Sequence, residues 1–114
     1  MLTIDKLNAM GVDTKDGIRR CCGMESFYLE MCKKMIDMST FEEMEKAVNE
    51  GNLDAAFGAV HNRKGTVGNL GMKQMLRPVE EMTELLRNRT QTDYSGYVRQ
   101  ILQMRDELKK ATQN

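Results

Sequence analysis

The chain has 114 residues, with 17 basic and 17 acidic side chains and therefore no formal net charge. This length predicts one domain over residues 1–114, and the balanced charge argues against binding of nucleic acid. No apolar run reaches the roughly 18–20 residues that a membrane span needs, and the first residues do not resemble a secretion leader, so we expect a cytoplasmic protein. One proline, no tryptophan and eleven methionines favour helices over a β-sandwich.

Apolar periodicity and capping residues predict five helical stretches. The first covers about residues 14–22. The second covers about residues 24–38, pauses at Ser39, and resumes with a capping box formed by Thr40 and Glu43. Its predicted apolar stripe consists of Met24, Phe27, Tyr28, Met31, Met35 and Met38.

The third stretch, about residues 53–70, is delimited by Asn52 as its N-cap and by Gly71 at its end. The fourth covers about residues 72–87, and Pro78 either kinks that helix or marks its true beginning. Its predicted apolar face consists of Met72, Met75, Leu76, Val79, Met82 and Leu86.

The fifth stretch covers about residues 92–111 and has an apolar face of its own. Short connections between amphipathic helices favour antiparallel neighbours. The sequence therefore predicts an all-α fold, an antiparallel up-down four-helix bundle with a short extra N-terminal helix.

His61 is the only histidine, which argues against metal sites built from several imidazoles. A helical wheel places it outside the core face of the third stretch. Gly58, Gly65 and Gly68 share its face, although three glycines inside a helix cost about 2–3 kcal/mol relative to alanine. Such a bare stripe lets another protein approach the imidazole closely. Lys64 follows three residues later and can reach a group attached to His61.

The charge distribution agrees with an anion near this face. Residues 61–114 carry ten basic and six acidic side chains, whereas residues 1–60 carry seven and eleven. No acidic residue lies between His61 and Val79. A negatively charged group near His61 would therefore be tolerated. Neither a GxxxxGK[ST] phosphate loop nor a GxGxxG motif is present, so the chain has no recognisable ATP site.

The segment of residues 61–71, HNRKGTVGNLG, resembles the signature of the histidine-containing phosphotransfer (HPt) domain. That signature reads H-x-L-K-G, a few small residues, and N-[LI]-G. His61, Lys64 and Gly65 match its first part, and the triplet of residues 69–71 matches its last part.

The resemblance implies a phosphorelay intermediate rather than a kinase. In this reading Nε2 of His61 accepts a phosphoryl group from the aspartyl phosphate of a receiver domain and passes it to another receiver. Lys64 would stabilise the phosphoryl oxygens, and Gly65 would give clearance for the receiver. The docking surface is expected to include Gly58, Asn62, Gly68 and Met72.

The partners expected from the resemblance are response-regulator receiver domains and a hybrid sensor histidine kinase. The chain itself would bind no cofactor or metal, because Mg²⁺ belongs to the receiver domain. We expect a monomer that binds neither nucleic acid nor membrane.

Two positions depart from the family pattern. Arg63 replaces the usual leucine, and the helical wheel turns it about half a circle away from His61, where its stem could extend along the edge of the bundle. Thr83 stands where many members have a glutamine or glutamate that assists the imidazole. We therefore assign no such assisting residue.

Two other interpretations stay open at this stage. The bundle could dock receivers or another helical protein without transferring phosphate. Alternatively, Cys21, Cys22, Cys32 and His61 could form a thiol or metal site, although adjacent cysteines fit poorly on one metal ion and small apolar packing explains them more simply.

Overall fold

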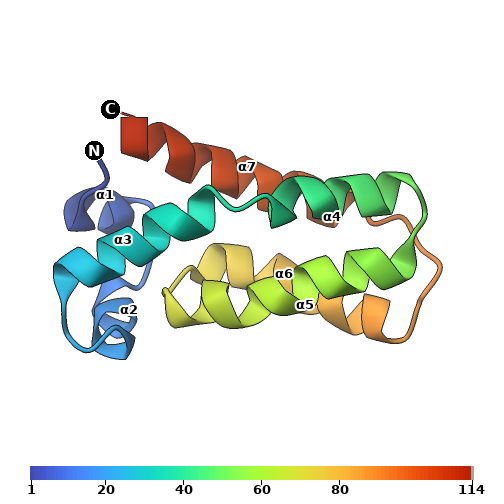
Figure 1. Ribbon diagram of the computed structural model, residues 1–114, viewed down its shortest axis with the longest axis horizontal. Helices are drawn as coiled ribbons and strands as arrows, with labels where there is room; N and C mark the ends of the chain where they lie inside the picture. The colour runs from blue at the N-terminus through green and yellow to red at the C-terminus, as the bar shows by residue number, and fades with distance from the viewer. Residues whose placement is uncertain (114) are drawn as a thin grey trace.

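Seven helices follow one another along residues 1–113, the part of the chain that the computed structural model describes (Figure 1). They are α1 (Ile4–Ala9), α2 (Thr14–Arg20), α3 (Glu25–Ile36), α4 (Thr40–Asn49), α5 (Leu53–Asn69), α6 (Lys73–Arg87) and α7 (Ser95–Gln113). None of them is both long and apolar enough to cross a membrane within those residues.

The bundle has four members, with α3 and α4 together forming the first, and successive members run in opposite directions (Figure 1). α3 and α4 run one way as two successive pieces, α5 returns, α6 runs forward again, and α7 returns along α4 and α3. The predicted antiparallel four-helix bundle is confirmed. The N-terminal part holds two short helices, α1 and α2, where the sequence predicted only one. The helix that was not predicted is α1.

The core is formed by one face of each long helix, as periodicity requires. On α6 the predicted face is correct, with Leu76 half-buried and its other members 2% exposed or less. The stripe predicted on α3 is partly wrong, because Met24, Phe27 and Met38 are 56%, 40% and 40% exposed. α3 is shorter than predicted, so Met24 and Met38 lie beyond its ends. Its buried side chains are Tyr28, Cys32, Met35 and Ile36.

The start of α4 differs from the predicted capping box. Thr40 is the first helical residue rather than the N-cap, and the N–H of Glu43 donates to the backbone oxygen of Ser39 (3.0 Å). The side-chain oxygen of Thr40 is buried and has no hydrogen-bond partner. α6 begins at Lys73 and incorporates Pro78, so the alternative that this helix begins at the proline is wrong.

The two ends of α5 are built as the sequence indicates. The side chain of Asn52 accepts a hydrogen bond from the N–H of Ala55 (3.1 Å) and so caps the first turn. At the other end Gly71 has φ of 75°, a left-handed conformation that favours glycine. A Cβ atom there would overlap the carbonyl oxygen of Asp13, whose own N–H donates to the oxygen of Gly71 (2.9 Å). This contact fastens the start of α2 to the α5–α6 turn.

Candidate functional site

His61 lies near the middle of α5 and is exposed. The opposite side of the helix is inserted into the bundle, where Ala56, Val60 and Val67 are fully buried. With a helical repeat of about 100° per residue, burial of these three side chains directs position 61 to solvent. The helix cap and the core contacts of α5 therefore determine where the imidazole stands.

The glycines beside His61 have open space in front of them. A Cβ atom at Gly58 or Gly65 would meet nothing within 4 Å, so packing inside the protein does not require glycine at either position. Gly68 is half-buried, and a Cβ there would lie 3.8 Å from the methyl groups of Leu76. Asn62 is exposed and Lys64 is half-buried. The predicted bare face is therefore present around Gly58 and Gly65.

Met72 does not belong to this face. It is 2% exposed and forms the N-cap position of α6, beyond the Gly71 turn. The wheel that placed it beside His61 continued the α5 repeat through Gly71, where the left-handed backbone ends that repeat. A side chain this buried cannot border a docking surface, so this prediction is wrong.

An apolar groove instead borders the C-terminal half of α5. It has a volume of about 590 Å³ and includes Phe27, Met31 and Met38 from α3 and the residues after it, together with Thr66 and Asn69 from α5. Phe27 and Met38 are each 40% exposed. On the α5 wheel Asn69 and Thr66 lie on the flank next to Gly65, so the groove and the bare face form one continuous side of the bundle.

Arg63 is turned away from His61, as predicted, but it does not extend along the edge of the bundle. It is only 8% exposed, its Nη1 donates to the sulfur of Met38, and its Nε has no hydrogen-bond partner. Burial lowers the pKa of the guanidinium below its usual value, while the nearby charge of Glu43 acts in the opposite direction. Loss of water from around the charged group is the dominant effect.

An aromatic and cationic cluster adjoins the imidazole, and the sequence reasoning missed it. The ring of Phe57 stacks on that of His61, with centroids 5.1 Å apart and an angle of 21° between the planes. The guanidinium carbons of Arg87 and Arg89 lie 5.5 and 4.9 Å from the Phe57 centroid. Nε of Arg89 also pairs with the carboxylate of Asp54 (2.6 Å). The i, i+4 spacing of the two rings was visible in the sequence, whereas the arginines come from the far end of α6 and the loop after it.

The hydroxyl of Thr83 forms a hydrogen bond within its own helix. The residue is fully buried, and its Oγ1 donates to the carbonyl oxygen of Val79 (2.6 Å). Its hydroxyl proton is therefore engaged inside α6.

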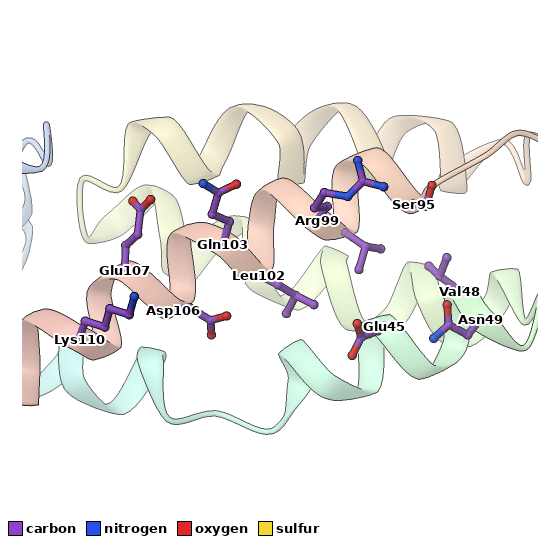
Figure 2. Close-up of a pocket in the computed structure, with 11 residues that line it drawn as sticks. Glu45, Val48, Asn49, Ser95, Arg99, Leu102, Gln103, Asp106, Glu107 and Lys110 are labelled. Atoms are coloured by element: carbon purple, nitrogen blue, oxygen red, sulfur yellow. The ribbon is translucent and has the colours of Figure 1, made fainter.

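Other features lie apart from His61. Cys21 and Cys32 are buried and Cys22 is exposed, and all three are free thiols. Across residues 1–113 no group of three or more His, Cys, Asp or Glu side chains could hold a metal ion. A groove of about 680 Å³ runs between α4 and α7, and Figure 2 shows Glu45 from α4 and Arg99, Asp106 and Lys110 from α7 along it. None of its lining residues belongs to α5.

The fold and the site together define a helical bundle that presents one exposed histidine from the middle of a helix. The family model described as Hpt domain matches residues 29–111, from α3 through most of α7. The chain therefore belongs to the Hpt domain family. Domains of this family serve histidine phosphotransfer in phosphorelays and interact with receiver domains. Comparisons with curated proteins and with solved structures gave no match.

Proposed function

We propose that the chain carries a phosphoryl group on His61, taken from the aspartyl phosphate of one receiver domain and delivered to the aspartate of another. The observation that carries the proposal is the position of the only histidine on an exposed helix face, between glycines with open space in front of them. Glycine at such positions weakens a helix. Packing inside the protein does not explain why glycine occupies these positions, whereas close approach of a partner protein does.

The transfer step balances with the groups that the two proteins bring. Neutral imidazole has a lone pair on one ring nitrogen, here Nε2, and the proton stays on Nδ1. As the new N–P bond forms, the P–O bond to the receiver's aspartate breaks, and the aspartate leaves as a carboxylate. The product is a phosphoimidazolium, and transfer to the next receiver reverses these bond changes.

Most of the catalytic effect in phosphoryl transfer comes from positioning and charge stabilisation. Lys64 lies on α5 three residues after His61, within reach of a phosphoryl group on the imidazole. We expect the receiver to bring Mg²⁺ for the remaining charge. Gly65 would admit the receiver's active-site loops, and Gly58, Asn62 and Gly68 would lie beneath the docked partner.

The apolar groove next to α5 supports docking of a protein partner on this side of the bundle. Phe27, Met31 and Met38 leave apolar surface exposed beside the bare face, and covering such surface favours association. This groove replaces Met72 as the apolar part of the proposed docking surface.

The test is direct phosphorylation. Wild type and His61→Ala are each incubated with a phosphorylated receiver domain and with phosphoramidate, and the products are examined by mass and by ³¹P NMR. We expect an acid-labile phosphoryl group on wild type and none on the variant. Absence of the label from wild type, with receiver binding intact, would instead identify a docking module that does not transfer phosphate.

A further inference from the structure

We propose that Phe57 is a positioning residue for phosphoryl transfer, because its ring holds the imidazole of His61 in the orientation that a receiver meets. The inference rests on the proposed function of His61. The observations behind it are the stacking of Phe57 on His61 and the two arginines that contact the Phe57 ring.

The stack orients the imidazole without covering its nitrogens. Phe57 and His61 are four residues apart on α5, so their side chains are neighbours on one helix face. Their rings are 5.1 Å apart and inclined by 21°, which places one face of the imidazole against the benzene ring. The nitrogen lone pair lies in the imidazole plane, so it points to the uncovered edge. An exposed histidine without such a neighbour would exchange among several staggered rotamers.

Phe57 is itself held in place from another part of the fold. Arg87 at the end of α6 and Arg89 just beyond it direct their guanidinium groups to its ring. Arg89 is anchored on one side by Asp54, in the first turn of α5, and on the other by the carbonyl oxygen of Leu86. These contacts connect the stack to the junction of α5 and α6.

A fixed imidazole favours transfer because the attacking nitrogen must be aligned with the phosphorus atom. Phe57→Leu keeps an apolar side chain but removes the ring, so the imidazole regains rotational freedom. We expect phosphoryl transfer from a receiver to this variant to slow by about tenfold. Phe57→Tyr keeps the ring and should restore a rate within about twofold of wild type.

The experiment combines transfer rates with proton NMR of His61. Because the chain has a single histidine, its two imidazole carbon-bound protons each give one assignable signal. The ring current of Phe57 shifts protons above its face upfield. This shift should be present in wild type and Phe57→Tyr and be lost in Phe57→Leu, without any phosphoryl group on the protein.

A matched pair tests the arginine contacts. Arg89→Gln removes a cation above the Phe57 ring and should reduce the upfield shift. Arg105→Gln removes the equivalent contact above Phe41, 5.3 Å from that ring's centroid, and should leave the His61 signals unchanged. Because these two variants keep Phe57, they also test the stack if Phe57→Leu fails to fold.

Unchanged His61 signals in Phe57→Leu, or a transfer rate equal to that of wild type, would overturn the proposal. These outcomes differ from a failure of the proposed function itself, in which wild type takes up no phosphoryl group from any donor. That last result would overturn both proposals, whereas a labelled wild type with an equally fast Phe57→Leu variant overturns only this one.

Discussion

Arg63 shows how a single residue can depart from the family signature without touching the chemistry. It lies on the same helix as His61 but on the buried side, where its Nε has no partner. A buried donor without a partner costs about 1–3 kcal/mol. The departure from the leucine of the signature therefore concerns stability, since Arg63 lies on the side of α5 opposite to the exposed His61.

Arg63→Leu should raise the free energy of unfolding by about 1–3 kcal/mol, because leucine removes the buried charge and its unpaired donor. Urea denaturation followed by circular dichroism measures the change. Arg77→Leu is the matched control, since the Arg77 side chain is 85% exposed and its replacement should shift stability by less than about 0.5 kcal/mol. A less stable Arg63→Leu protein would show that the guanidinium is a necessary part of the core.

Gly65→Gln should slow phosphoryl transfer from a receiver by at least about tenfold, because the added side chain occupies the space that the partner needs. Stability should not fall, since Gly65 is exposed in a helix and glutamine favours helix by about 0.5–1 kcal/mol over glycine. Single-turnover rates and thermal unfolding measure the two effects.

Gly96→Gln provides the control for that substitution. Gly96 is also an exposed helical glycine where an added Cβ atom would meet nothing within 4 Å, but it belongs to α7. The same substitution there should leave transfer unchanged. Equal rates for the two variants would contradict docking over Gly65.

At the scale of elements, the last part of the matched motif has a structural explanation. Asn69 ends α5, and the carbonyl oxygen of Leu70 accepts a hydrogen bond from the Tyr28 hydroxyl (2.7 Å). Gly71 then turns the chain toward α6 and lies against Asp13. These residues connect α5 to α3, to α6 and to the start of α2. Leu70 and Gly71 thus help to hold the helix that presents His61.

Gly71→Ala should lower the free energy of unfolding by at least about 2 kcal/mol, because a left-handed alanine is strained and its Cβ overlaps the Asp13 oxygen. Gly51→Ala is the matched control. Gly51 has a similar φ of 69° but open space around it, so only the backbone strain of about 1–2 kcal/mol applies there. If thermal or urea unfolding shows that both variants lose the same free energy of unfolding, the contact with Asp13 does not contribute to stability.

At the scale of the whole molecule, periodicity predicted the long helices and the bundle because each long helix buries one continuous face. It missed α1, since six residues are too few to display a helical period. That helix is nevertheless capped by Thr3 and anchored by the fully buried Leu7.

Features of the candidate site that depend on α5 alone could be predicted from the sequence. Features that depend on contacts between α5 and other parts of the chain could not. The exposed position of His61 and the bare glycines follow from the α5 wheel alone. The Phe57 cluster needs Arg87 and Arg89 from the following helix and loop, and no spacing within the sequence brings those together. Met72 was predicted on the wrong face because the helical wheel does not continue through the Gly71 turn. The burial of Arg63 was not predicted, because it depends on a contact with Met38, 25 residues earlier.

α5 is one uninterrupted helix from Leu53 to Asn69, with His61 near its centre rather than in a hinge or loop. The side chain of Asn52 caps its first turn, and its inner face packs into the core. Gain or loss of a phosphoryl group at His61 would therefore change the local charge but not the course of the chain. Under the proposed function, the signal passed on is therefore a change of charge on an uninterrupted helix, and we expect the accompanying change of shape in the receiver.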